Sequence, residues 1–309
     1  MTGFEYIAMN LTDEFGSVLL RNGMVVTFFL DDDHPSHAGK IKAAMMDFAQ
    51  QFMSGKSIYF PDDDALVEVE GVDISALLDH RIVRAGSPPK FALVDAEADA
   101  PCFSVAYCGL DRLHLASLDW PHTACGLRFS FSLEAMDENG LFDIFDFAGR
   151  WARALPLASG LIAPAFVYRE GVDEIVAFRS IARLCRRYRC MDIPALMIDC
   201  FEVGTGVKGA YWCNFLGGEA LARIGGEARL REAFADTGAH IESLGDERLS
   251  ITLGPLPVYG DVNRRQDLDA YRLAFGLFES ALRPRTVPYL GFDEESMQAW
   301  IERFAGGDA

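Results

Sequence analysis

The longest apolar runs of this chain have the length of a β-strand, and stretches of helical periodicity separate them. Residues 25–30 form one such run, far short of the roughly 20 apolar residues that span a bilayer. Residues 40–53 instead repeat apolar positions at the spacing of one helix face. Because strands and helices follow one another without regular βαβ alternation, we predict an α+β fold with a mostly antiparallel sheet flanked by helices.

The individual elements follow from the same two periodicities. We predict strands at 19–30, 56–60, 65–69, 91–94, 102–108, 112–117, 125–133, 158–168, 210–215, 240–243 and 249–253. Segment 19–30 is either one strand or a hairpin that turns at Asn22-Gly23. We predict helices at 40–53, 73–80, 141–154, 172–188, 218–224, 227–235, 268–282 and 293–304. No Pro/Gly/Ser-rich linker divides the chain, so we expect one unit, 1–309, with subdomains 1–140 and 141–309.

The net charge of −18 is unevenly distributed. Residues 1–145 contain 23 Asp and Glu against 9 Lys and Arg, a net charge of −14, which leaves −4 for residues 146–309. A field of this sign repels nucleic acid and anionic membranes and speeds the encounter with a basic partner. Solubility alone also explains an acidic surface.

The seven cysteines indicate the redox environment. They are odd in number, lack C-x-x-C spacing and lie in apolar, strand-like contexts such as CFSVAYC and MIDCF. We interpret them as buried, reduced thiols without zinc-ligand spacing. The first residues, MTGFEYIAMN, show no basic and apolar signal-peptide pattern, so we expect a cytoplasmic protein.

Two motifs suggest ligand binding but have simpler explanations. Residues 204–209 match G-x-G-x-x-G, yet the following AYWCNF is strand-like, so we predict a loop or hairpin rather than a dinucleotide site. Residues 31–37, DDDHPSH, gather carboxylates and imidazoles, which could hold a divalent ion. We predict instead a solvated connection from strand to helix with Ser36 as N-cap. Asp62, Asp63 and Asp64 follow Pro61 in a predicted turn.

Other motifs add no chemistry. G-x-S-x-G and H-E-x-x-H are both missing, so we predict no catalytic residue, no metal ligand and no cofactor. The basic residues Arg183, Arg186, Arg187 and Arg189 end a predicted helix, where the macrodipole favours positive charge.

The C-terminal third contains a longer pattern. It runs from VKGAYWCNFLGGEALARIGGEARLREAF through GPLPVYGDVN to DLDAYR. This pattern resembles the type VI immunity family. The matching positions are Gly209, Trp212, Gly225, Gly226, Pro255, Pro257, Gly260, Asp261, Asn263 and Tyr271. We expect these residues to be mainly structural: Trp212 in the core, the two prolines in an extended turn, and Asp261 and Asn263 bonding that turn.

The resemblance implies a non-catalytic immunity protein that binds and neutralises a cognate type VI secretion toxin, with nuclease-type toxins among the family partners. Our candidate toxin contacts are Asp31, Asp32, Asp33, Asp62, Asp63 and Asp64, together with Tyr59 and Phe60 as exposed aromatic residues nearby. An enzyme that reverses the toxin's modification and an adaptor of the secretion apparatus remain alternatives. The protein could be a monomer or a homodimer.

Overall fold

The computed structural model describes residues 9–62, 65–69, 73–136, 140–168, 170 and 174–306. These residues form ten α-helices and one eleven-stranded sheet whose ladders are all antiparallel. The predicted α+β class with a mostly antiparallel sheet is therefore confirmed.

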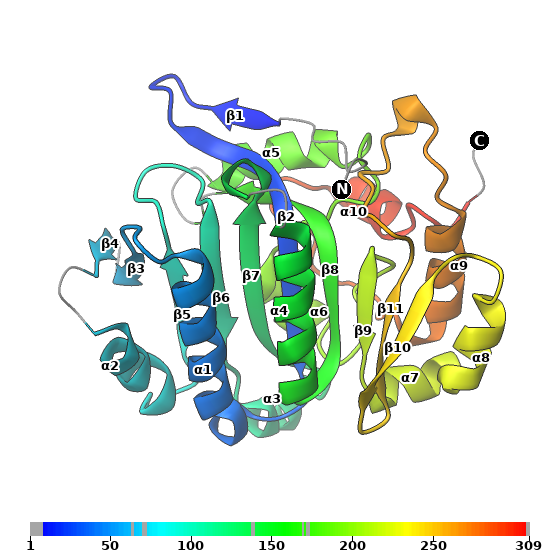
Figure 1. The fold of residues 1–309 in the computed structure, drawn as a ribbon, viewed down its shortest axis with the longest axis horizontal. Coiled ribbons are helices and arrows are strands. Elements are labelled where there is room, and N and C mark those ends of the chain that lie inside the picture. The colour runs from blue at the N-terminus through cyan, green and yellow to red at the C-terminus, as the bar shows by residue number, and fades with distance from the viewer. Residues whose placement is uncertain are drawn as a thin grey trace.

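The sheet runs continuously from the last strands of the chain to early ones (Figure 1). Its order is β10 (His240–Gly245), β11 (Arg248–Thr252), β9 (Cys213–Leu216), β8 (Leu157–Tyr168), β2 (Val18–Leu30), β7 (Cys125–Ser132), β6 (Phe103–Cys108), β5 (Lys90–Val94), β3 (Tyr59–Asp62) and β4 (Ala65–Glu68), and β1 (Asn10–Thr12) pairs with β2. The central strand β2 pairs with β7 on one side and β8 on the other.

The helices cover both faces of the sheet (Figure 1). In front lie α1 (His34–Phe52) and α4 (Gly140–Ala154), while α5 (Glu174–Leu184), α6 (Leu196–Glu202) and α10 (Glu294–Ile301) lie behind. The helices α7 (Gly218–Ile224), α8 (Gly226–Ala233) and α9 (Asp269–Phe278) flank the β9–β11 end. At the lower end lie α2 (Ile74–Leu78), which continues as a π-helical turn at Asp79–Val83, and α3 (Arg112–Ser117). Short 3-10 turns occupy Leu133–Ala135, Val262–Arg264 and Glu279–Ala281.

Burial on both faces explains the continuous apolar run of β2. Phe28 faces the front core with Met24 and Val26, whereas Val25 and Phe29 pack on the opposite side. Phenylalanines dominate the front core, where Phe129 lies 4.8 Å from Phe147 and 5.1 Å from Phe48 between ring centroids. Phe48 comes from α1 and Phe147 from α4, so this cluster fixes both helices on the sheet.

Two sequence predictions are wrong, and the structure decides between the two alternatives left open for residues 19–30. Residues 112–117 form α3 rather than a strand, because the Asp111 carboxylate caps the helix by accepting the His114 N–H at 2.9 Å. The MIDCF segment is helical and belongs to α6. Residues 19–30 form one strand without a hairpin at Asn22-Gly23, and a Cβ at Gly23 would lie 2.1 Å from the Phe131 carbonyl oxygen. That glycine serves close strand packing rather than a turn.

Candidate functional site

The histidines of segment 31–37 point into the core rather than toward the aspartates. Helix α1 already begins at His34, so Ser36 is not its N-cap. His34 Nε2 donates to the Ile82 carbonyl at 2.9 Å, which leaves His34 Nδ1 to accept the Tyr107 hydroxyl at 2.9 Å. Tyr107 in turn accepts from His37 Nε2 at 3.0 Å. Within the described part of the chain, no group of three or more His, Cys, Asp or Glu side chains could hold a metal.

Burial keeps these two histidines neutral. Desolvation lowers the pKa of His34, and it lowers the pKa of His37 to about 4, with a further lowering from His34 and opposing contributions from Asp32 and Asp33. The hydrogen bonds of His34 also need a neutral ring, because its Nδ1 accepts while its Nε2 donates. The motif therefore anchors the first turn of α1.

The aspartates of the same segment lie at the surface beside α3. Asp31 accepts from the Arg112 guanidinium at 3.1 Å, and Asp33 accepts the Arg112 backbone N–H at 2.8 Å. Arg112 also donates to the Thr123 carbonyl at 2.6 Å, which ties the start of α3 to the end of its loop. Asp31 and Asp32 stay exposed. The connection from β2 to α1 thus presents carboxylates next to α3.

The second predicted group lies elsewhere. Tyr59, Phe60 and Asp62 belong to strand β3, and β7, β6 and β5 separate this strand from β2, which leads into Asp31. Phe60 is buried against Phe91, so it is not the exposed aromatic we expected, and Tyr59 is half-buried. Asp62 pairs with Arg81, while Asp63 and Asp64 lie outside the described residues.

Helix α3 and the turn after it expose an unusual amount of apolar surface. The helix buries none of its residues, and Leu113 is 78% exposed. Just after it, Leu118 is 55% and Trp120 43% exposed. Contiguous exposed apolar side chains on a soluble protein often mark a site of protein association. We call Leu113, Leu118 and Trp120, with the neighbouring carboxylates Asp31, Asp32, Asp111 and Asp119, the α3 surface.

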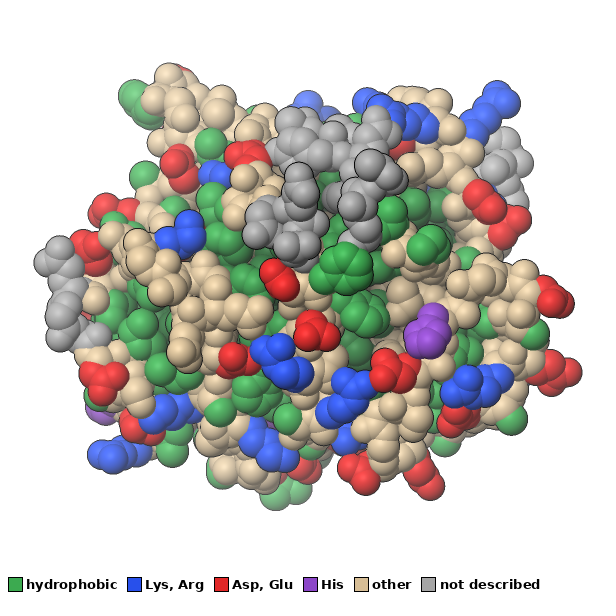
Figure 2. All heavy atoms as spheres, viewed as in Figure 1, with side chains coloured by type: hydrophobic (Ala, Val, Ile, Leu, Met, Phe, Trp, Pro, Cys, Tyr) green, Lys and Arg blue, Asp and Glu red, His purple; other side chains and the backbone are tan. Residues whose placement is uncertain are grey.

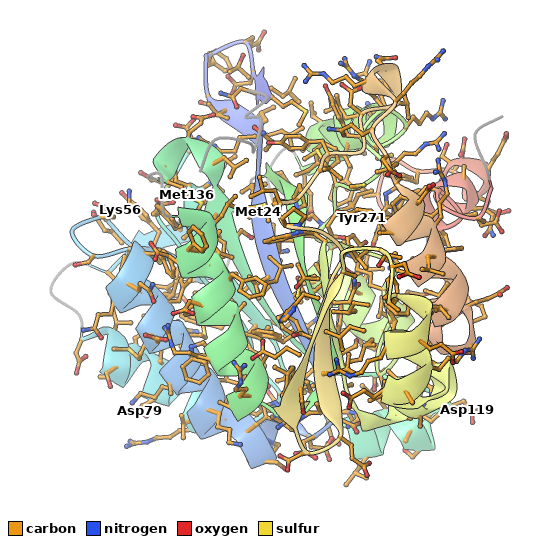
Figure 3. The ribbon with its side chains drawn as sticks, turned by 45° about the vertical axis from the view of Figure 1, so that its right-hand side comes forward. Met24, Lys56, Asp79, Asp119, Met136 and Tyr271 are labelled. Carbon is orange, nitrogen blue, oxygen red and sulfur yellow. The ribbon has the colours of Figure 1, made fainter. Side chains whose placement is uncertain are left out.

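Local geometry holds this surface in place. Asp119, just after the end of α3, adopts a left-handed conformation with φ of 67°; Figure 3 labels it at the lower right of the molecule. The Trp120 ring meets Phe201 of α6 edge-on at 5.6 Å between centroids, and the Trp120 backbone N–H donates to the Leu115 carbonyl at 2.9 Å. Beside Trp120 lies a shallow pocket of about 210 Å³ that His122, Phe201 and Arg283 also line.

The apolar residues of this surface were not among the contacts predicted from the sequence. Arg112-Leu113-His114-Leu115 alternates polar and apolar residues, which favoured a buried strand. The available signal was the Asp111 side chain ahead of the segment, which suits a helix N-cap, together with Asp119 and the Trp120-Pro121 step after it.

Several residues of the immunity-like pattern lie in turns or in the core. Gly225 ends α7 with φ of +102°. Gly260 has φ of +67°, and a Cβ there would lie 2.7 Å from the Cys190 sulfur. Asp261 accepts the Asn263 N–H at 3.0 Å and forms two hydrogen bonds with the Arg187 guanidinium, which hold the pKa of that carboxyl below its usual range. Tyr271, labelled in Figure 3, is buried on α9 against Phe304.

Trp212 combines a core role with a pocket wall. It is buried, and its indole N–H donates to the Gly254 carbonyl at 2.9 Å. Together with Phe142, Phe145 and Pro255 it lines an open apolar pocket of about 400 Å³. Hydrophobic side chains gather over this part of the front face, around the upper half of α4 (Figure 2). Phe142, at 58% exposed, forms the most accessible part of this wall.

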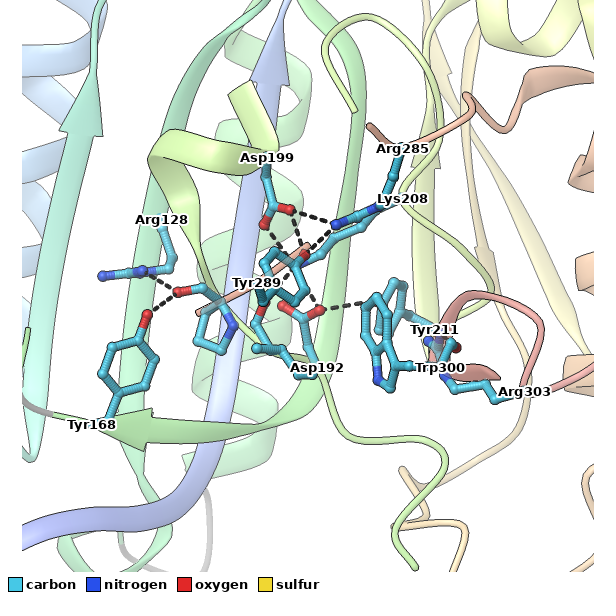
Figure 4. A network of polar contacts seen from close by, with 12 residues as sticks. Arg128, Tyr168, Asp192, Asp199, Lys208, Tyr211, Arg285, Tyr289, Trp300 and Arg303 are labelled. Carbon is cyan, nitrogen blue, oxygen red and sulfur yellow. Dashed lines mark hydrogen bonds and ion pairs between the residues drawn. The ribbon is translucent and has the colours of Figure 1, made fainter. Parts of the chain in front are cut away.

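A buried ionic network lies behind the sheet (Figure 4). Lys208 of the 204–209 loop pairs with both Asp192 and Asp199 at 2.7 Å. Asp199 also pairs with Arg285 at 3.3 Å and accepts the Tyr289 hydroxyl at 2.6 Å. Two carboxylates thus face two cations, all with side chains at most 4% exposed. Side chains buried this deeply are out of reach of a substrate. The network instead connects residues 192–208 to the C-terminal segment.

The loop itself confirms that residues 204–209 are no dinucleotide fingerprint. Helix α6 precedes it instead of a strand, and β9 rather than a helix follows it. The seven cysteines are all free thiols, and six of them are buried. Within the described part of the chain, no helix is both long and apolar enough to cross a membrane.

Comparisons with known proteins agree with the immunity-like pattern. A family model described as TsiV, type VI immunity for VRR-NUC, matches residues 40–304. A solved structure named Pseudomonas aeruginosa T6SS protein PA0821 superposes with a TM-score of 0.78 at 16% identity, covering 98% of this chain and 88% of that one. At this identity the likeness shows a shared fold. A search of curated proteins gives no significant match.

Proposed function

Because the chain belongs to the TsiV family of type VI immunity proteins, we propose that it binds a cognate VRR-NUC toxin and neutralises it stoichiometrically. The NUC part of the family description points to a nuclease as the toxin. A nuclease needs a positive face for its nucleic acid substrate, and an acidic protein can bind that face. The partner is therefore a basic protein, and nucleic acid itself is not a ligand of the acidic half.

The α3 surface is our candidate for the contact. Binding hot spots are usually aromatic or large apolar side chains surrounded by a polar rim. Trp120 and the two exposed leucines supply such a centre, and Asp31, Asp32, Asp111 and Asp119 supply a negative rim. The single observation that carries this proposal is that α3 buries none of its residues although it contains large apolar side chains, of which Leu113 is the most exposed. Of the contacts predicted from sequence, Asp31 and Asp32 belong to this surface, whereas Asp62 does not.

Two features support binding without chemistry. The strongest cluster of ionisable groups, around Lys208, is buried and already neutral in sum. The carboxylates at the start of α3 serve local structure, since Asp111 caps the helix and Asp31 pairs with Arg112. We also propose that the protein acts in the cytoplasm, where a nuclease toxin meets its substrate.

We further propose that residues 1–140 and 141–309 act as one unit. Strand β2 of the first part pairs over 11 positions with β8 of the second. Separation of the two parts would expose the unpaired edges of both strands. A single cooperative unfolding transition, measured by circular dichroism and by tryptophan fluorescence, is the expected behaviour, and two separate transitions would contradict it.

Co-expression tests the proposed function. The cognate toxin is produced alone and together with this protein, growth is followed, and an affinity tag on the toxin is used for purification. We expect growth to be restored and the two chains to co-purify in equal amounts. Restored growth without a complex would favour an enzyme that reverses the damage. The absence of both restored growth and a complex would exclude immunity against that toxin.

A further inference from the structure

We propose that Cys108 and Cys200 form an oxidation site, at which a small hydroperoxide converts the two thiols into a disulfide between β6 and α6. Both residues are free thiols in the structure. Cys108 ends β6, and Cys200 lies on α6 behind the sheet (Figure 1). The inference does not depend on the proposed function.

A row of directly opposite residues crosses the back of the sheet at Cys108. In the antiparallel ladders, Cys108 pairs with Lys90 of β5 on one side and with Gly126 of β7 on the other. Gly126 in turn pairs with Phe29 of β2, which packs on the back face. Directly opposite residues point to the same face of a sheet, with β-carbons about 4.5–5.5 Å apart. The side chains of Lys90 and Cys108 therefore point toward α6.

Gly126 leaves the space that the Cys200 thiol fills. A Cβ at Gly126 would lie only 2.5 Å from the Cys200 sulfur. That sulfur thus occupies the place of a side chain at position 126, directly beside Cys108. The two thiols are hydrogen-bonded, and this bond lowers the pKa of Cys108. Thiols in such contact reach the geometry of a disulfide by rotation of their side chains.

An open pocket brings a small oxidant to Cys108. The pocket has a volume of about 350 Å³, and its lining includes Lys90, Cys108, Leu196 and Met197. Cys108 keeps 3% of its surface exposed, whereas Cys200 is completely buried and does not line the pocket. A hydroperoxide that enters from solvent therefore meets Cys108 first.

The surroundings give the two thiols different roles. The hydrogen bond with Cys200 lowers the pKa of Cys108 more than burial raises it, and the Lys90 ammonium group lowers it further. Burial raises the pKa of Cys200 well above its ordinary value, so this thiol keeps its proton. The thiolate is the nucleophile in thiol oxidation, and redox-sensitive cysteines combine a low pKa with a nearby resolving thiol. Cys108 is thus the attacking thiol, and Cys200 resolves.

The remaining thiols do not share this environment. Burial raises the pKa of each of them, to about 12 for the two most deeply buried. They are Cys102, Cys125, Cys185, Cys190 and Cys213. We expect them to stay reduced under mild oxidation.

The reaction balances with one hydrogen peroxide. The Cys108 thiolate attacks the O–O bond, so an S–O bond forms, hydroxide leaves, and the sulfur is oxidised to a sulfenic acid while the peroxide is reduced. The Cys200 sulfur then attacks the Cys108 sulfur, so the S–S bond forms and the S–O bond breaks. The hydroxyl group leaves as water with the Cys200 proton, and the proton lost by Cys108 neutralises the hydroxide. Two thiols and one peroxide thus give a disulfide and two waters.

Peptide mapping of the full chain tests this inference. The folded protein is treated with hydrogen peroxide, the remaining thiols are alkylated in denaturant, and tryptic peptides are analysed by mass spectrometry without reduction. We expect peptides 91–112 and 190–208 as a linked pair that dithiothreitol separates, with fragmentation placing the bond between Cys108 and Cys200. Unchanged thiols after treatment, or bonds between other cysteines, would overturn the proposal.

Alanine variants separate the attacking thiol from the resolving one. In Cys200→Ala the reaction should stop at the sulfenic acid of Cys108, which dimedone labels, and Cys108→Ala should show about tenfold less label. Cys213→Ala, at a completely buried thiol of β9, is the matched control and should form the disulfide as the unaltered chain does. Equal dimedone labelling of Cys200→Ala and Cys108→Ala would contradict the assigned roles and overturn the proposal.

Discussion

Lys208 Nζ lies 2.7 Å from Asp192 Oδ1, and both side chains are almost completely buried. The same ammonium group lies 2.7 Å from Asp199 and donates to the Ile193 carbonyl at 2.9 Å. One cation thus serves two carboxylates from the segment between β8 and the 204–209 loop. Burial raises the pKa of Tyr211 and of Tyr289, so their hydroxyls stay protonated and donate to Asp192 and Asp199.

Removal of that ammonium group should destabilise the fold strongly. Lys208→Met leaves two buried carboxylates with too little positive charge, and we expect a loss of roughly 3–5 kcal/mol in the free energy of unfolding. Lys90→Met, at an exposed lysine, is the control and should change it by less than about 0.5 kcal/mol. Urea denaturation measures both, and equal effects of the two substitutions would contradict a structural role of the network.

If the α3 surface binds the toxin, alanine substitutions of two exposed aromatic residues should differ clearly in their effect on affinity. Trp120→Ala should weaken toxin binding by about 30-fold, the equivalent of roughly 2 kcal/mol, as expected for a hot spot. Phe142→Ala removes a comparably exposed ring at the apolar pocket and should leave affinity within about threefold. Surface plasmon resonance with immobilised toxin decides between them. The opposite order would move the contact to the pocket lined by Trp212.

Charge at the same surface should act mainly on the association rate. Asp32→Lys with Asp119→Lys reverses two exposed carboxylates, so the rate constant should fall about tenfold at low salt, and its salt dependence should flatten. Asp62→Lys, at the distant strand β3, should have a much smaller effect. If Asp62→Lys slowed association as much as the double substitution, the overall charge rather than this surface would govern the encounter.

The buried histidines predict a loss of stability in weak acid. In the folded protein the pKa of His37 is about 4, below its ordinary value of 6.5. The unfolded chain therefore binds a proton that the folded chain does not, and stability that is complete above pH 6.5 falls as the pH drops toward 4. Between pH 7 and pH 5 the loss from His37 is roughly 2 kcal/mol. His37→Gln should flatten this dependence in urea titrations, and an unchanged slope would refute the assignment.

The sequence was sufficient where periodicity and local capping decide the structure. Helix α4 and strands β7 and β8 lie within a residue or two of their predicted bounds, because one side of α4 and both sides of these strands are buried. Helix α3 was missed because the alternation around Leu113 and Leu115 imitates a strand, whereas the Asp111 cap decides for a helix. Periodicity describes burial, and a helix that buries nothing has no such pattern to show.

Long-range pairing could not be predicted from the sequence. Lys208 lay within a glycine-rich motif whose simplest explanation was a loop, and its partners Asp192 and Asp199 carry no local signal. The aspartates at 31–33 and at 62 looked equivalent along the chain, yet strands β7, β6 and β5 separate β2, which leads into the first group, from β3, which carries Asp62. Only the fold shows that the first group adjoins exposed apolar residues and that Phe60, next to the second group, is buried.

The measurement that tests immunity by binding most directly is a titration of toxin activity in vitro. Purified protein is added stepwise to a fixed concentration of the cognate nuclease, well above the dissociation constant, and cleavage of a labelled substrate is recorded. We predict a linear decrease in cleavage that reaches zero at one equivalent of this protein. Full inhibition at a small fraction of an equivalent, or full cleavage at a large excess, would contradict the account.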